Sequence, residues 1–269
     1  MFLNKLLEMN RFVIPLFAFL LVAASCEREE DDIISKPTPT STVIKGTICT
    51  PDGRPFAGIP VTVDYEFKSI VASIVKHKGR ATTDNNGNYS VFFEIGEDTV
   101  DKYDLHTKYV FSVDLSSVSP ETYLRPMEKF DFILSVEDRE GKTLNCDFTI
   151  PVKKYVKVNV ENTGLPVTEG RYAVKNTFSY GSGWGALGGG DSDAACDLFL
   201  FEQIDIPAEG SHSVMLPCGV GITNTAQLGY LGLGEPPFIS CYPLGDVQEL
   251  YVSNTGDEEL TFKYIVPEI

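Results

Sequence analysis

Short runs in which hydrophobic and polar residues alternate fill most of the chain after residue 42, and helical periodicity is almost absent. Alternation with a period of two is typical of strands that place one face against a core. In the first half it predicts strands at Val43–Cys49, Ile59–Tyr65, Tyr89–Ile95, Tyr109–Leu115, Phe130–Val136 and Thr143–Val152. The turn residues Asp138 to Gly141 predict that the last two of these strands form a hairpin.

The second half shows the same pattern. It predicts strands at Tyr155–Glu161, Arg171–Tyr180, Asp197–Ile206, Ser213–Pro217, Ala226–Leu231, Phe238–Tyr242, Leu250–Ser253 and Leu260–Val266. The segment Asn254–Phe262 looks like an edge hairpin of immunoglobulin-like domains. We expect a boundary near Pro151 and an all-β fold of two tandem β-sandwiches, residues 43–152 and 153–269, because each part is long enough for its own core.

The start of the sequence is predicted to be an export signal. An apolar run from Phe12 to Ala24 follows Lys5 and Arg11, and it is too short to span a bilayer as a helix. The sequence Ala24-Ser25-Cys26 resembles the end of a bacterial lipoprotein signal, which implies removal of residues 1–25 and acylation of Cys26. Cleavage near Ser25 without acylation and a retained membrane anchor are the alternatives.

Residues 26–42 are predicted to be a linker. The acidic tract from Glu27 to Asp32 resembles the signal by which some Gram-negative bacteria send lipoproteins to the outer face of the outer membrane, and a tract that only keeps a tether solvated is the alternative. The Pro- and Thr-rich segment Ser35–Thr42 is expected to be extended and stiff. The predicted location is therefore the outer membrane, lipid-anchored and exposed at the cell surface.

Residues 44–89 carry a family resemblance. The strand Ile44–Ile48, the turn Asp52-Gly53-Arg54-Pro55, the strand Gly58–Val63 and the turn Thr83–Tyr89 are similar to the carboxypeptidase regulatory-like family. The resemblance implies a prealbumin-like sandwich that serves as an accessory module and carries no catalytic residues. The segment Glu66–Arg80 is longer than the usual link in that family.

Charge narrows the range of partners. The chain has 38 acidic and 22 basic residues, a net charge of −16. Binding to nucleic acid or to anionic lipid by charge depends on clustered Lys and Arg, which the sequence lacks. We expect no nucleic-acid partner.

The cysteines predict one disulfide, since export makes disulfides possible. Cys196 and Cys218 flank a predicted hairpin and would lie nearly opposite each other. Cys146 is in phase with inward-facing residues and Cys49 with outward-facing ones, which argues against a bond between them. No spacing of Cys or His indicates a metal site, and the three histidines belong to no catalytic motif.

A glycine-rich segment, residues 180–193, holds the only tryptophan. An aromatic ring on a loop can stack on a sugar or enter a partner's pocket. We therefore predict ligand contacts at Tyr180, Trp184 and Tyr230, and the alternative is that Trp184 caps the second sandwich.

Together these features predict a lipid-anchored surface protein that binds outer-membrane lipid through acylated Cys26. It is expected to act as a non-enzymatic binding or adhesion module for a glycan or protein ligand, without catalytic residues, metal or cofactor. The alternatives are an accessory domain pair of a surface hydrolase and a structural component of a surface assembly.

Overall fold

The computed structural model describes residues 27–34, 36–68, 73–96, 107–125, 127–134, 140–162, 172–179, 198–204, 210–230, 242–243, 247–255 and 259–264. Every regular element in these ranges is a strand, which confirms the predicted all-β class. The strands are β1 (Glu27–Asp31), β2 (Thr42–Cys49), β3 (Pro60–Lys68), β4 (Ser73–Thr82), β5 (Asn88–Phe93), β6 (Thr107–Asp114), β7 (Lys129–Leu134), β8 (Thr143–Asn145), β9 (Phe148–Thr149), β10 (Lys153–Asn162), β11 (Tyr172–Phe178), β12 (Leu198–Ile204), β13 (Gly210–Gly219), β14 (Thr223–Tyr230), β15 (Tyr242–Pro243), β16 (Gln248–Tyr251) and β17 (Glu259–Tyr264).

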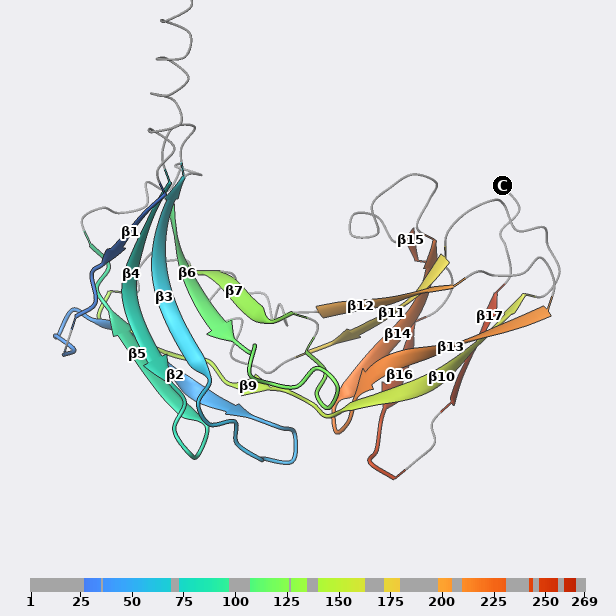
Figure 1. Cartoon of the computed structure of the whole chain (residues 1–269). Coiled ribbons are helices and arrows are strands. Elements are labelled where there is room, and N and C mark those ends of the chain that lie inside the picture. Colours follow the sequence, from blue (N-terminus) through green and yellow to red (C-terminus); the bar gives the residue numbers. More distant parts are fainter. Residues whose placement is uncertain are drawn as a thin grey trace, which may run out of the picture.

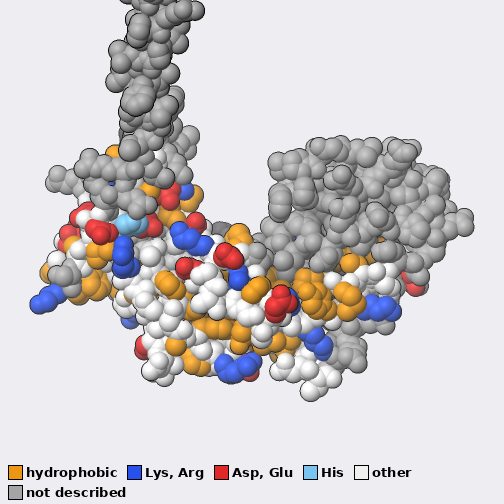
Figure 2. Space-filling model, viewed as in Figure 1, with side chains coloured by type: hydrophobic (Ala, Val, Ile, Leu, Met, Phe, Trp, Pro, Cys, Tyr) orange, Lys and Arg blue, Asp and Glu red, His pale blue; other side chains and the backbone are white. Residues whose placement is uncertain are grey.

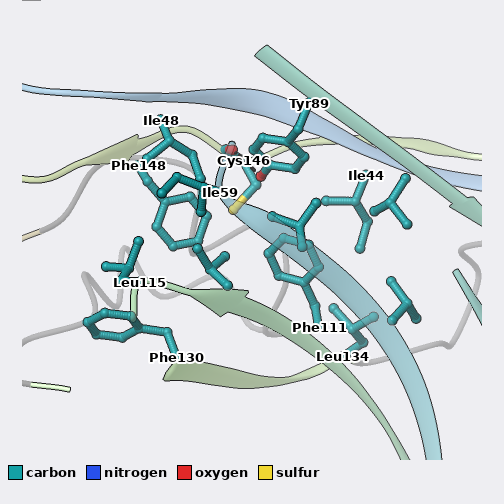
Figure 3. Close-up of a cluster of buried hydrophobic side chains, with 14 of the residues drawn as sticks. Ile44, Ile48, Ile59, Tyr89, Phe111, Leu115, Phe130, Leu134, Cys146 and Phe148 are labelled. Carbon is teal, nitrogen blue, oxygen red and sulfur yellow. Dashed lines mark hydrogen bonds between the residues drawn. The ribbon is translucent and has the colours of Figure 1, made fainter. Parts of the chain in front are cut away.

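Strands β1 to β9 form the first sandwich (Figure 1). Its larger sheet has the order β1-β4-β3-β6-β7, and its smaller sheet has the order β5-β2-β8, with β9 also paired to β2. Alternate residues of both sheets point inward. Figure 3 shows Ile44 and Tyr89 of the smaller sheet packed with Phe111 and Leu134 of the larger one. Burial of this aromatic and aliphatic surface is the main stabilising contribution to the first sandwich.

In the smaller sheet the backbone of β2 at Gly46 lies very close to the backbone of Cys146. Strands β8 and β9 run parallel to β2 and are interrupted at Cys146 and Asp147. A Cβ on Gly46 would lie 1.8 Å from the carbonyl oxygen of Cys146, so no larger residue fits there. The Asp147 carboxylate accepts hydrogen bonds from the backbone N–H of Thr47 at 2.7 Å and from its hydroxyl at 2.9 Å. This carboxylate thus takes the place of a ladder carbonyl where the strand is interrupted.

Strands β10 to β17 form the second sandwich. One sheet has the order β13-β10-β17 and the other has the order β12-β11-β14-β15, with β16 also paired to β14. The core contains Val156, Val158 and Val160 of β10, which alternate with half-buried or exposed residues, together with Leu216 and Leu228. The period-two pattern thus faces a core as predicted, and the fold class of two tandem β-sandwiches is confirmed.

Three local predictions differ from the structure. The segment Glu66–Arg80, expected as a long link, contains the end of β3 and most of β4, which pair antiparallel. Strands β7 and β8 form no hairpin, because β7 pairs with β6 and β8 pairs with β2. Strands β16 and β17 likewise belong to different sheets, so the hairpin expected around Asn254–Phe262 does not form. In each case the pairing of a strand depends on the whole sheet and not on the residues that precede or follow it.

The expected linker is also folded against the first sandwich. Glu27–Asp31 forms edge strand β1 rather than a solvated tether, and Thr42 already belongs to β2. In the Pro- and Thr-rich segment the backbone N–H of Ser41 donates to the carbonyl of Thr38 at 3.1 Å, and the Thr38 hydroxyl donates to Glu94 at 2.7 Å. A side-chain hydrogen bond therefore holds this segment against the first sandwich.

Candidate functional site

The first candidate site is the acidic segment Glu27–Asp32, called here the acidic clamp. Strand β1 runs parallel to β4, with Glu27 opposite Ser73 and Asp31 opposite His77. The backbone N–H of Asp32 continues the pairing by donating to the carbonyl of His77 at 2.9 Å. Because parallel pairing gives each residue a ladder partner, the clamp is held along its whole length.

Two ion pairs fasten the end of the clamp. Arg80 lies 3.3 Å from Asp31 in an exposed pair, and Lys78 contacts the carboxylate of Asp32. The Lys78 side chain is only 7% exposed, whereas that of Asp32 is 56% exposed. A buried ammonium needs a partner, so Asp32 neutralises a charge that the sheet has withdrawn from water. Figure 2 shows acidic, basic and histidine side chains gathered over this part of the first sandwich.

A β-bulge between β3 and β4 positions the charged side chains beside the clamp. The register of β3 and β4 shifts between Val63 and Asp64, which leaves Lys78 without a ladder partner on β3. Beside it, Nδ1 of His77 lies 2.8 Å from Asp64, and the Thr62 hydroxyl donates to the other oxygen of Asp64 at 3.4 Å. The Asp64 carboxylate thus links β3 to His77 of β4.

The second candidate site is the junction between the sandwiches, which is centred on Asn224. This side chain is fully buried. Its Oδ1 accepts from the backbone N–H of Gly219 at 2.8 Å and from Nδ2 of Asn176 at 3.0 Å. Its Nδ2 donates to the carbonyls of Gly219 at 2.8 Å and Ile222 at 3.2 Å. One side chain therefore closes the turn that joins β13 to β14.

This turn lies against the first sandwich. The backbone N–H of Val220 donates to the carbonyl of Val152 at 2.9 Å, and a Cβ on Gly221 would lie 3.0 Å from Pro51. Phe178 and Ile222 of the second sandwich pack against the core of the first. The two sandwiches thus share apolar contacts as well as a backbone hydrogen bond.

A small hollow of about 50 Å³ opens at the junction, lined among others by Asp52, Arg54, Gly221 and Asn254. The Thr50 hydroxyl and the Arg54 guanidinium hold the pKa of Asp52 below its ordinary value. Arg54 lies 3.0 Å from Asp52 and both side chains are exposed. The opposite charges of Asp52 and Arg54 therefore compensate each other within one turn, and this turn lines the hollow at the junction.

The cysteines of the first sandwich are unpaired thiols. Cys146 is fully buried, as its phase predicted, and burial raises the pKa of its thiol to about 12. Cys49 is half-buried, and burial raises its thiol pKa as well. Both thiols are therefore protonated at neutral pH and are poor nucleophiles.

The predicted disulfide concerns the second sandwich. Cys218 is fully buried in its core, and Cys196 lies outside the described residues. The hairpin expected between them is absent, because β12 pairs with β11 and β13 pairs with β10. The bond between Cys196 and Cys218 stays a prediction, without the support that a hairpin would give it.

The predicted lipid and ligand residues fall mostly outside the described ranges. Cys26, Tyr180 and Trp184 lie there, and Tyr230 is the last residue of β14, with its backbone opposite Tyr172 and Tyr242. These sites stay predictions. Within the described ranges no three His, Cys, Asp or Glu side chains are grouped so as to hold a metal ion. In the same ranges no helix has the length and apolar character needed to cross a membrane.

Sequence reasoning missed the junction and the clamp. Asn176 is in phase with Val174 and Phe178, and Asn224 is in phase with Ala226 and Leu228. An asparagine on the apolar face of a strand is a signal of a buried hydrogen-bonding group. That signal was present in the sequence, whereas the pairing of an all-charged segment as a strand had no such signal.

Comparisons with known proteins give distant similarities only. No protein-family model matches the sequence, and no curated protein matches it. Among solved structures, the shaft pilin SpaA from Lactobacillus rhamnosus GG is 12% identical, with 85% of this chain and 100% of the pilin covered at a TM-score of 0.28. A streptococcal ancillary pilin is 12% identical, with 86% of this chain and 64% of the pilin covered at a TM-score of 0.26.

A 9R-lipoxygenase from Cyanothece PCC8801 is also similar, with 13% identity, 46% of this chain covered and a TM-score of 0.28. The chain spans only 18% of the length of that enzyme. Similarities of this size assign neither a family nor an activity.

Proposed function

We propose that the protein is a lipid-anchored surface protein whose two β-sandwiches act as a non-enzymatic binding or structural module. The observation that carries the proposal is the packed junction, because it makes two small domains into one stiff unit. Phe178 and Ile222 cross from the second sandwich to the core of the first, and Val220 donates to Val152. A protein that only tethered its domains would not need such contacts.

A rigid pair of sandwiches is suited to holding a ligand-contacting surface in a fixed place. Loops at the end of a rigid scaffold hold a ligand-contacting surface at a defined distance from the attachment point. Under this proposal Cys26 attaches the chain to the outer membrane, the first sandwich is a carboxypeptidase regulatory-like module, and Tyr180, Trp184 and Tyr230 of the second sandwich contact a glycan or a protein. The absence of clustered basic residues makes such ligands more suitable than nucleic acid.

Attachment is tested by membrane fractionation and fatty-acid labelling of the full chain. Cys26→Ala should lose the label and move to the soluble fraction, since burial of acyl chains supplies the membrane affinity. Cys49→Ala is the matched control and should stay with the membrane, because Cys49 is a half-buried thiol of the folded domain. Unchanged fractionation of Cys26→Ala would refute the anchor.

Binding is tested by probing glycan and protein arrays with the full chain and with Trp184→Ala. Loss of a signal in the variant, at unchanged urea stability, supports ligand contact. If the variant instead loses about 3–5 kcal/mol of stability, the ring fills a core and the binding role falls.

A further inference from the structure

We infer that the acidic clamp fixes the orientation of the protein at the membrane, so that the end of the larger sheet next to Glu27 lies in the lipid headgroup layer. This inference rests on the proposed acylation of Cys26. The surface concerned, called here the membrane end, consists of Phe67 at the end of β3, Ser73 and Ile74 at the start of β4, and Lys108 at the start of β6.

The first step is the length of the attachment. If residues 27–42 were a free linker, their sixteen residues could hold the first sandwich up to roughly 50 Å from the acylated cysteine. In the structure the linker has no free length at its start, because Glu27 is already paired with Ser73. Cys26 is bonded to Glu27, so its Cα lies about 3.8 Å from that of Glu27. The lipid and the start of β4 are therefore held together.

The second step is the direction of the strands. Strand β1 runs parallel to β4, and it begins at the end of the sheet where β3 finishes and β4 starts (Figure 1). Phe67 lies opposite both Ile74 and Thr107, which brings three strand ends to this place. The opposite end of the sheet lies one β4 length away, ten residues or about 33 Å. Among the described parts of this sheet, the membrane end lies nearest to the attachment point.

The third step is the chemistry of the membrane end. Phe67 and Ile74 are partly exposed apolar side chains, and Lys108 lies 3.2 Å from Glu66 at the same end. Apolar side chains beside a long cationic one suit the boundary between headgroups and acyl chains. The net charge of −16 repels anionic lipid, so the occupant is a zwitterionic bilayer and the acyl chains supply the affinity. Tethering makes even a weak contact persistent, because the effective concentration is high.

The clamp resists removal in three ways. Its backbone pairs along β4, Asp31 pairs with Arg80, and Asp32 neutralises the buried Lys78. Releasing the strand would leave Lys78 without its carboxylate in a site that is only 7% exposed. The attachment point thus stays on the sheet, and the orientation is a property of the fold.

The test places a photo-reactive benzophenone residue at one of two positions in the full chain, reconstituted in phosphatidylcholine vesicles. The first position replaces Lys108, and the second replaces Asn86, an exposed residue in the turn at the opposite end of the sheet. After irradiation, mass spectrometry should find phospholipid adducts at position 108 and none at position 86. Equal adducts at both positions, or none at 108 in vesicle-bound protein, would overturn the inference.

A second pair of variants tests the clamp itself. Glu29→Pro with Glu30→Pro removes two backbone N–H groups from β1, whereas Glu29→Gln with Glu30→Gln changes charge and keeps both. The proline variant should stay on vesicles and lose the adduct at 108, and the glutamine variant should keep it. Retention of the adduct in the proline variant counts against the clamp. Protein that fails to bind vesicles at all refutes the anchor at Cys26, which separates the two failures.

Discussion

Replacing Asn224 with alanine should destabilise the second sandwich and loosen the junction. The side chain is fully buried and makes four hydrogen bonds, two with the backbone of Gly219, one with Ile222 and one with Asn176. Alanine makes none of them. The backbone N–H and carbonyl of Gly219 then lose these partners in a buried turn, while Nδ2 of Asn176 keeps its bond to the carbonyl of Pro217 at 2.9 Å.

The expected loss of stability follows from the backbone groups that lose Asn224 as their hydrogen-bond partner. A buried polar group without a partner costs about 1–3 kcal/mol, and the two groups of Gly219 are the main losses. The carbonyl of Ile222 adds less, because Ile222 is only partly buried. A loss of about 3–5 kcal/mol results, which is a large fraction of the 5–15 kcal/mol typical of a domain.

The assay is urea unfolding followed by circular dichroism, with Asn159→Ala as the matched control. Asn159 is also an asparagine on a strand of the second sandwich, where it accepts a hydrogen bond from the Ser213 hydroxyl at 2.6 Å in an exposed site. Its replacement should cost no more than about 0.5 kcal/mol. If Asn224→Ala lowers the free energy of unfolding by less than about 1 kcal/mol, the explanation is wrong, because two buried backbone groups without partners cost more than that.

Three further outcomes are expected. Gly46→Ala should abolish soluble expression because its Cβ meets the backbone of Cys146, while Gly53→Ala has open space around it and should cost about 1–2 kcal/mol in urea unfolding, from its φ of 84° alone. Backbone N–H groups of Asn88 and Asn86 hold the pKa of Asp84 below its ordinary value. Its stabilising contribution is full above about pH 4 and is lost as pH falls through the lowered pKa, so Asp84→Asn should flatten the acid limb of urea midpoints. Finally, Cys146 should resist thiol reagents at neutral pH in native protein and react in urea, as peptide mass spectrometry would show; native reactivity would contradict its burial.

Alternation predicted most strands because burial of one face of a strand gives a period-two pattern within that short segment itself. Val43–Cys49 and Tyr109–Leu115 coincide within one or two residues with β2 and β6. Pairing was less accessible, because a strand's partner depends on where the other strands lie. Phe130–Val136 was predicted to pair with the strand that follows it, whereas β7 joins β6 and the next strand joins β2 in parallel.

The clamp could not be predicted for a different reason. Glu27–Asp31 contains only charged residues and lacks any apolar phase, so its sequence is typical of a solvated tether. It is nevertheless a strand because an edge needs backbone groups and tolerates charge. Its partner β4 was hidden as well, since Lys76, His77 and Lys78 break the alternation that would mark a strand.

Buried polar side chains lie both at the clamp and at the junction between the sandwiches. Lys78 is buried at a β-bulge, where an extra residue interrupts the ladder and its ammonium meets Asp32 of the clamp. Asn224 is buried where β13 turns into β14, and its amide closes the turn that lies against Pro51. An apolar residue at either site would bury as much surface without specifying the attached segment. Lys78 thus helps to hold β1 on the first sandwich, and Asn224 holds the turn through which the second sandwich contacts the first.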